Sequence, residues 1–272
     1  MKYTKMHGAG NGFVLIDNVD SSLDIDKCRS LAVRLCGIEE TDGLLAVCPA
    51  DDADFGMLYI NSDGSVGEMC GNGARCIARY GYERGFSKNP DCIRFRATAG
   101  IVTGRRVSEK IYEVRLNDPS VIDLHRPAFL CGKEWDCSYI ELGCPGIPVV
   151  TVEIPFDAFE NLTELRELGR QLRHHKVFPK GANITFVSPP EGNRVRAITF
   201  ERGVEDFTLA CGTGSSGAAI TLLLRERILG DSVELEVPGG HLSVRICREG
   251  ERITDVFLTG PTAYVYERSI DI

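Results

Sequence analysis

Two short segments of this sequence carry the same Cys-Gly-x-Gly pattern directly before a stretch with helical spacing. One begins at Cys70 and the other at Cys211. Glycines at the start of a helix let the backbone turn sharply and leave N–H groups pointing outward. Those N–H groups and the helix dipole form an anion site, and the same field favours a thiolate over a thiol. Each segment therefore offers an activated cysteine beside a site of carboxylate or phosphate size.

A single segment of this kind is more often a helix cap with a buried cysteine. The two copies lie 141 positions apart, about half the chain, which indicates two versions of one fold. If the two halves pack about a pseudo-twofold axis, both thiols face one cleft. This arrangement suits inversion of a stereocentre, because one thiolate takes a proton from one face of a carbon while a thiol returns one to the other. Two helix N-termini would stabilise the carbanion in a closed, dry cleft.

The elements that must position these segments are mostly short strands. Alternating or β-branched runs dominate, and helical spacing is clear only in residues 26–36, 74–85, 162–173 and 215–229. This pattern predicts an α+β fold in which each helix covers or fills a curved, mostly antiparallel sheet.

The repeat also predicts two domains. Pro119 and Pro127 bracket a linker-like segment between the two copies. We expect an N-terminal domain of residues 1–117, completed by 262–272, and a C-terminal domain of residues 118–261.

Composition narrows the class of protein. The 272 residues carry a net charge of −8, which argues against a general nucleic-acid-binding surface. No stretch approaches the roughly 18 apolar residues of a membrane span, and the first residues lack a signal-peptide core, so we expect a cytoplasmic protein. The eleven cysteines form no Cys-x-x-Cys pair, and most should be free thiols. The sequence predicts no metal site and no cofactor, and it is compatible with a homodimer.

Eight blocks, in order along the chain, match one known family. They are residues 6–13 (MHGAGNGF), 41–45 (TDGLL), 61–65 (NSDGS), 69–76 (MCGNGARC), 181–187 (GANITFV), 201–204 (ERGV), 208–214 (TLACGTG) and 237–240 (VPGG). With these blocks the sequence resembles the diaminopimelate epimerases, which are cofactor-independent enzymes with two catalytic cysteines. The resemblance covers nearly the whole chain. It implies two similar domains, each a barrel-like sheet holding a central helix, with the active site in the cleft between them.

The resemblance also implies roles for individual residues. Cys70 and Cys211 would be the acid/base pair, and Glu201 and Asn11 would hold the reacting ammonium. Asn61, Asn183 and Arg202 would contact the distal amino acid end of the substrate. The α-carboxylate would lie against backbone N–H groups near Gly71, Asn72, Gly73, Gly212, Thr213 and Gly214. The implied reaction converts LL-diaminopimelate to meso-diaminopimelate, in lysine and peptidoglycan precursor synthesis. The implied partner is a small-molecule amino acid substrate, with no nucleic acid and no membrane.

Taken one at a time, several of these residues have ordinary structural interpretations. Asn11 and Asn61 are typical turn residues, Glu201 and Arg202 could form a surface ion pair, and Cys76 is expected in the core. Their positions within the matched blocks favour the functional interpretation.

The sequence departs from the family in two places. Residues 143–149 lack the histidine and the asparagine of the family's Pro-His segment, and Phe207 stands where an acidic residue is common. These changes leave three alternatives open. One is a racemase of another amino acid, such as histidine, lysine or ornithine. The others are a non-catalytic protein that binds an anion and an isomerase of carboxylates that are not amino acids.

Overall fold

The structure is a computed structural model that describes every residue except Glu68, Glu251 and Ile272. The chain forms two compact units. The first consists of residues Met1–Arg115 and Thr259–Ile272, and the second of residues Leu116–Leu258. The last strand, β18 (Arg252–Ser269), contributes residues to both.

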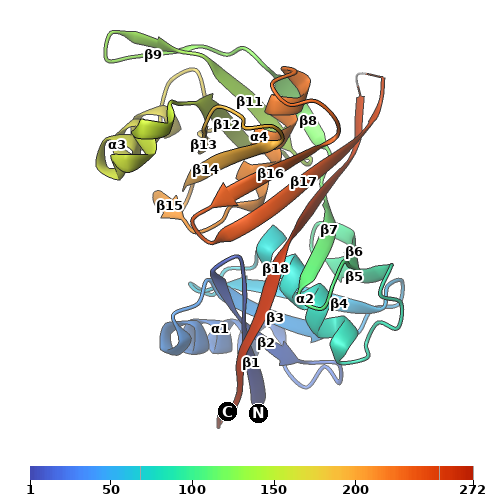
Figure 1. Ribbon diagram of the computed structural model, residues 1–272. Coiled ribbons are helices and arrows are strands. Elements are labelled where there is room, and N and C mark those ends of the chain that lie inside the picture. The colour runs from blue at the N-terminus through green and yellow to red at the C-terminus, as the bar shows by residue number, and fades with distance from the viewer. Residues whose placement is uncertain (68, 251, 272) are drawn as a thin grey trace. The chain divides into compact units, whose positions relative to one another are not determined.

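The first unit is a closed barrel of eight strands (Figure 1). Neighbouring strands follow the order of the chain, and β18 pairs with β1 to close the barrel. The pairs β1–β2, β3–β4, β5–β6, β6–β7 and β1–β18 are antiparallel, whereas β2–β3 and β4–β5 are parallel. The strands of this unit besides β18 are β1 (Lys2–Gly8), β2 (Asn11–Asp17), β3 (Gly43–Cys48), β4 (Phe55–Asn61), β5 (Ile93–Ala97), β6 (Gly100–Arg106) and β7 (Ile111–Leu116).

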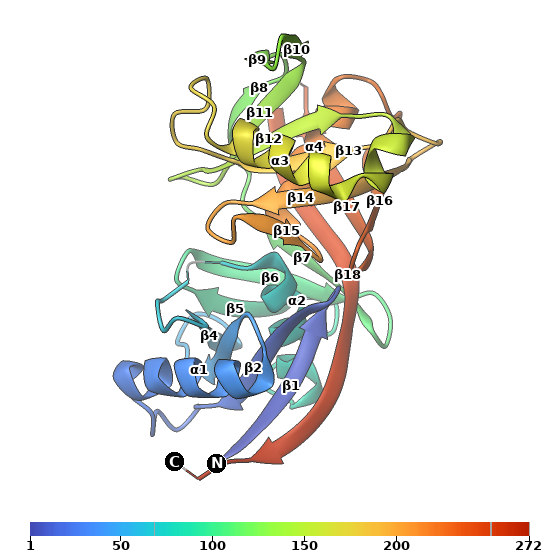
Figure 2. The same ribbon diagram turned by 90° about the vertical axis from the view of Figure 1, so that its left-hand side faces the viewer.

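Two helices have different places in this unit. Helix α2 (Gly71–Glu83) is buried on nearly all sides and contacts strands β1, β2, β3, β5 and β6, so it fills the barrel. Gly81 permits this close approach, because a Cβ there would lie 2.4 Å from the ring of Phe55. Helix α1 (Ile25–Glu39) is amphipathic and covers the outside of β2, β3 and β4 (Figure 2). Asp24 caps its N-terminus by accepting a hydrogen bond from the N–H of Lys27.

The second unit repeats this order of elements. Its main sheet runs β8-β11-β12-β13-β14-β16-β17-β18, with β12–β13 and β14–β16 as the parallel pairs. Helix α4 (Gly212–Leu224) contacts β11, β12, β13, β16 and β17, and α3 (Leu162–Arg173) packs on β13 and β14. The strands are β8 (Pro119–Asp123), β11 (Cys137–Leu142), β12 (Ile147–Glu153), β13 (Asn183–Val187), β14 (Arg194–Glu201), β16 (Ser232–Val237) and β17 (Gly240–Glu249).

The second unit also contains several smaller elements. Strands β9 (Ala128–Leu130) and β10 (Lys133–Trp135) form a separate hairpin, and β15 (Asp206–Thr208) pairs with β14. A 3₁₀ helix, η1 (Phe156–Glu160), precedes α3. The core beneath α3 is built from aromatic and β-branched side chains, including Phe159, Phe186 and Phe200.

The two units therefore share one topology. In each, an antiparallel strand pair is followed by an outer helix, a second antiparallel pair, a central helix and two further strands. The expected α+β fold with two similar domains, each a curved and mostly antiparallel sheet around a central helix, is confirmed. No helix in the described part of the chain is long and apolar enough to cross a lipid bilayer.

The central helices begin earlier than their apolar spacing predicts. We expected them to start at Ala74 and Ser215, but they start at Gly71 and Gly212. The reason is that glycine has no side chain and so adds nothing to a pattern of apolar residues. The first turn of each helix therefore cannot be predicted from helical spacing. The glycines of Cys-Gly-x-Gly lie within the first helical turn rather than before it.

Candidate active site

Cys70 and Cys211 both occupy the N-cap position of a central helix. Their backbone torsions are nearly equal, with φ, ψ of −133°, 116° at Cys70 and −118°, 111° at Cys211. An N-cap side chain lies beside the first N–H groups of its helix, which have no intrahelical acceptor. At Cys211 this contact is made, because the N–H of Gly214 donates to the Cys211 Sγ at 3.4 Å.

The surroundings of Cys211 oppose ionisation of its thiol. The residue is buried, with a relative exposure of 6%. Burial raises the pKa of Cys211 well above its ordinary value, and the charge of Glu201 raises it further. The contacts with Thr213 and the N–H of Gly214 lower this pKa but do not reverse the shift. The expectation that both helix N-termini yield activated thiolates is therefore wrong for Cys211, because desolvation outweighs the helix dipole.

A chain of hydrogen bonds joins Cys211 to three predicted substrate-binding residues. The Thr213 hydroxyl lies 3.4 Å from the Cys211 Sγ, and the Asn183 amide donates to that hydroxyl at 3.3 Å. The N–H of Arg202 donates to the Asn183 Oδ1 at 2.8 Å. Glu201, which precedes Arg202, accepts a hydrogen bond from the Thr208 hydroxyl at 3.1 Å. The structure thus brings the side chains of Asn183, Thr213 and Glu201 together near Cys211. Arg202 joins them through its backbone, while its exposed side chain donates to the Lys180 carbonyl at 3.3 Å.

The space around Gly214, in the first turn of α4, is too small for a larger residue. A Cβ on Gly214 would lie 2.6 Å from the Thr199 hydroxyl and 2.7 Å from the Thr185 hydroxyl. These two hydroxyls are hydrogen-bonded to each other at 3.0 Å. Glycine at position 214 therefore lets the first turn of α4 rest directly on β13 and β14.

In the first unit, Asn11 and Asn72 are brought together. The Asn72 amide donates to the Asn11 Oδ1 at 3.1 Å. Asn11 also contacts the Asp42 carboxyl, which accepts from the N–H of Gly12 at 3.0 Å. Burial raises the pKa of Asp42, and the contacts with Asn11 and Gly12 oppose that shift.

Asn61, by contrast, has local contacts. Its amide donates to the Ser65 hydroxyl at 2.9 Å, and its carbonyl accepts from the N–H of Gly64. These bonds define the tight turn that follows β4, as the ordinary interpretation predicts. A role in substrate binding stays a prediction for this residue.

The segment that departs from the family connects β11 to β12. At Gly146 a Cβ would lie 2.5 Å from the Cβ of Glu141 and 2.7 Å from its Oε2. Glu141 is buried, and it accepts hydrogen bonds from the Tyr139 hydroxyl at 2.5 Å and from the Lys180 ammonium at 2.9 Å. No side chain fits at position 146 without displacing this carboxylate. A histidine at this position would therefore clash with Glu141.

Phe207, the second departure, belongs to the packing of the second unit. Its ring makes edge contacts with the rings of Phe186 and Phe200, and the Arg166 guanidinium lies over it. An aromatic residue here fills apolar space that an acidic residue would leave poorly packed.

Some residues of the site were not assigned roles from the sequence. Arg75, Asp42 and Thr208 lie inside matched blocks and hydrogen-bond to predicted ligands. Their position within those blocks was the sequence feature that could have identified them as site residues. The Glu141–Lys180 pair joins residues distant in sequence, and only the fold reveals it. Among the other cysteines, Cys76 is fully buried as expected, whereas Cys92 is exposed.

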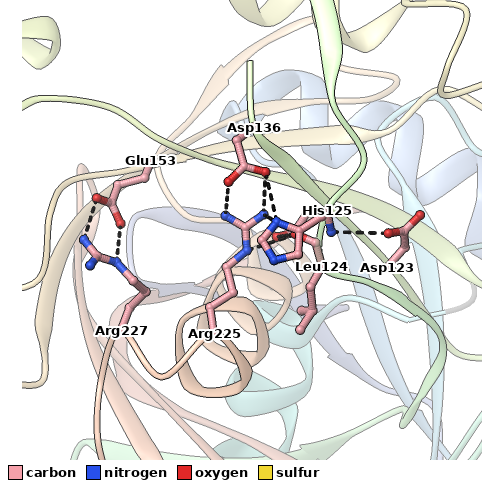
Figure 3. Close-up of polar contacts among 8 residues, drawn as sticks. Asp123, Leu124, His125, Asp136, Glu153, Arg225 and Arg227 are labelled. Atoms are coloured by element: carbon pink, nitrogen blue, oxygen red, sulfur yellow. Dashed lines mark hydrogen bonds and ion pairs between the residues drawn. The ribbon is translucent and has the colours of Figure 1, made fainter. Parts of the chain in front are cut away.

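A cavity of about 1060 Å³ in the second unit lies apart from these residues. Its lining includes apolar side chains of α3 and charged groups near the end of α4. Those charges are paired with one another: Arg225 with Asp136, and Arg227 with Glu153 (Figure 3). None of the predicted site residues lines this cavity.

Among residues 1–67, 69–250 and 252–271, no cluster of three or more His, Cys, Asp or Glu side chains is arranged to hold a metal ion.

Comparison with known proteins agrees with these geometric features. The family model described as diaminopimelate epimerase matches residues 3–113 and 146–265. A diaminopimelate epimerase of Aquifex aeolicus is 35% identical over 98% of this chain and 96% of its own length. Among solved structures, the fold is similar to a PhzF-family phenazine biosynthesis protein of Bacillus anthracis, with a TM-score of 0.76 and 16% identity over 100% of this chain and 99% of that one. It is also similar to a hydroxyproline epimerase of Agrobacterium vitis, with a TM-score of 0.69 and 18% identity over 99% and 90% of the two chains. The chain belongs to the diaminopimelate epimerase family.

Proposed function

We propose that this protein is an isomerase that inverts the α-carbon of LL-diaminopimelate to give meso-diaminopimelate. The observation that carries the proposal is the equivalent N-cap position of Cys70 and Cys211 on two matching helices. Inversion needs one proton carrier for each face of the carbon. A repeated fold with one thiol in each copy supplies two carriers of the same chemistry.

The proton balance of this mechanism is simple. One cysteine acts as a thiolate and takes the α-proton, which leaves a carbanion on the substrate. The other cysteine acts as a thiol and gives its proton to the opposite face. The enzyme ends with the two protonation states exchanged. Because burial and the charge of Glu201 raise the pKa of Cys211, we assign it the role of the thiol in the free enzyme.

The first-turn N–H groups of α2 and α4 would bind the α-carboxylate. Helix N-termini favour anions, and charge that develops on the carboxylate as the proton leaves would be stabilised in the same place. The residues concerned are Gly71, Asn72, Gly73, Gly212, Thr213 and Gly214.

The reacting ammonium would bind to Glu201 and Asn11. This contact has a consequence for Cys211, because the negative charge of Glu201 raises the pKa of that thiol. A substrate ammonium beside Glu201 would compensate that charge and make the Cys211 thiolate more accessible. Binding of the substrate would therefore prepare Cys211 for the reverse reaction.

The distal end of the substrate would be read by Asn183, Arg202 and Asn61. Asn183 and Arg202 are already joined to each other and, through Thr213, to Cys211. A substrate group bound by Arg202 is thus linked to the Cys211 thiol through these hydrogen bonds. We further propose that the reaction uses no pyridoxal phosphate or other cofactor and takes place in the cytoplasm. A homodimer remains a prediction.

A panel of amino acids tests the proposal. The protein is incubated in D2O with LL-diaminopimelate, meso-diaminopimelate, lysine, ornithine and histidine, and α-proton exchange and optical inversion are measured for each. We expect both diaminopimelate isomers to be the best substrates by kcat/KM. Faster turnover of a monocarboxylate amino acid would overturn the substrate assignment, and no exchange with any of them would favour a binding protein.

One observation favours a racemase of another amino acid as the second candidate. The Glu141–Lys180 pair lies beside the segment that lacks the family's histidine and asparagine. A charged pair in that position changes which distal groups can be accommodated. The same panel separates the two candidates, because they predict opposite orders of kcat/KM.

A further inference from the structure

Arg75 is a buried cation in α2, and within residues 1–67, 69–250 and 252–271 no carboxylate forms an ion pair with it. Its side chain is fully buried, at 0% relative exposure. One Nη donates to the Asn72 Oδ1 at 2.8 Å and the other to the Gly71 carbonyl at 3.4 Å. Within the described part of the chain its Nε has no hydrogen-bond partner. Burial lowers the pKa of Arg75 to about 10, which still leaves it charged at neutral pH.

Burying a charge is costly, so the fold gains something by keeping Arg75 inside the barrel. The matching helix α4 shows that a helix with this N-cap geometry does not require a buried charge in its first turns. In α4 the equivalent position is Ser216, which is neutral and buried and donates to the Gly212 carbonyl at 2.9 Å. The two helices begin with the same N-cap geometry, yet only α2 carries a charge there.

Arg75 determines how the Asn72 amide is oriented. A guanidinium has only donors, so the atom of Asn72 that faces it must be the carbonyl oxygen. The Asn72 NH2 group then points to Asn11 and donates to its Oδ1 at 3.1 Å. That bond in turn directs the Asn11 NH2 group toward the Asp42 carboxylate. A cation at one end and an acid at the other thus orient both amides.

We propose that Arg75 is a positioning residue that holds the Asn11 carbonyl oxygen ready to accept a hydrogen bond from the substrate ammonium. An amide oxygen has two lone pairs, and Asn72 uses one of them. If the Asn11 amide were reversed, its NH2 group would face the ammonium and repel it. This proposal rests on the proposed function, since it concerns the amino group at the reacting carbon.

Three variants test the proposal on the full-length protein. Arg75→Met removes the charge and both hydrogen bonds, and Arg75→Lys keeps the charge and one donor. Asn72→Asp keeps an acceptor for Arg75 but cannot donate to Asn11. The matched control is Arg79→Met, because Arg79 is buried on the same helix but bonds to Glu83 and Thr262 instead. Each variant is compared with wild type at temperatures where both are folded, as judged by thermal unfolding.

We expect Arg75→Met and Asn72→Asp to raise KM by about tenfold, a loss typical of one misplaced hydrogen bond to a charged group. The change in KM should exceed the change in kcat, Arg75→Lys should recover most of it, and Arg79→Met should leave KM within about twofold of wild type. The substrate concentration that half-protects Cys70 from iodoacetamide gives the same comparison without turnover. Unchanged KM in both Arg75→Met and Asn72→Asp, or an equal rise in Arg79→Met, would overturn the proposal.

The kinetics are measured on whichever amino acid the wild-type protein turns over best. A failure of diaminopimelate as substrate is therefore seen in the wild type, whereas a failure of the positioning role is seen only in the ratio of variant to wild type. If Arg75→Met does not fold, Asn72→Asp decides the question, because it leaves the buried guanidinium with a partner of opposite charge.

Discussion

Cys70 and Cys211 are structurally equivalent residues. Each is the N-cap of a 13-residue helix that fills or crosses its own curved sheet, and the two helices start 141 positions apart. Their electrostatic surroundings differ, however. Arg75 interacts favourably with a thiolate at Cys70, whereas Glu201 raises the pKa of Cys211. A repeated backbone thus presents two thiols that are alike in geometry and unlike in charge environment.

The first prediction concerns both thiols. Cys70→Ala and Cys211→Ala should each lower the rate of inversion by at least about a hundredfold, because each removes the proton carrier for one face of the carbon. Circular dichroism should show both variants folded. The exposed Cys92 and Cys144 are controls, and serine at either should leave inversion unchanged. Near-normal inversion in either alanine variant would refute the two-thiol mechanism.

The second prediction concerns the pH at which Cys211 ionises. Glu201→Gln removes a negative charge that raises the pKa of Cys211, so that pKa should fall and the thiolate should appear at lower pH. The rate of iodoacetamide modification at Cys211, followed by peptide mass spectrometry across pH, measures this shift. Thr208→Val, which leaves the carboxylate in place, should produce a smaller change. A profile that moves to higher pH in Glu201→Gln contradicts the electrostatic account.

The third prediction concerns the distal end of the substrate. Arg202→Met should raise KM for diaminopimelate by about tenfold or more, because the distal carboxylate would lose its charged partner. The exchange rate for lysine, which has no distal carboxylate, should change little. Steady-state kinetics on the two substrates make the comparison. An equal loss on both would mean that Arg202 supports the fold rather than substrate choice.

The fourth prediction concerns stability at the turn between β11 and β12. Gly146→Ala should lower the free energy of unfolding by about 1–3 kcal/mol, because its Cβ would overlap Glu141. Gly37→Ala is the control. That glycine lies in α1 with no atom within 4 Å of its Cβ position, so alanine there should be neutral or stabilising. Chemical denaturation measures both. Equal stability of the two variants would show that the turn relaxes freely.

The fifth prediction concerns cofactors. Inversion should survive dialysis against EDTA and treatment with hydroxylamine, because the proposed mechanism relies on thiols and helix N-termini alone. The assay is optical inversion before and after treatment. Activity that is lost and then restored by one added metal would require a different mechanism.

Several features follow from the sequence because they depend on neighbouring residues. The repeated Cys-Gly-x-Gly pattern identified the two central helices and the pairing of the two halves, since a motif that recurs at half the chain length reflects a duplicated backbone. Helix α3 was predicted with its bounds, residues 162–173, because apolar residues alternate with charges at helical spacing. The matched blocks indicated which polar residues belong to the site.

Other features depend on residues that are far apart in the chain, and only the tertiary structure decided them. The helix field at Cys211 is local, but its pKa is governed by burial and by Glu201, which arrives on a different strand. The Glu141 carboxylate that fills the space at Gly146 is held by Lys180, and the Asn72 amide is oriented by Arg75 only because the barrel excludes water around both. Sequence spacing describes which residues share a helix or strand face. The dielectric environment and the pairing of buried charges arise only when separate elements pack together.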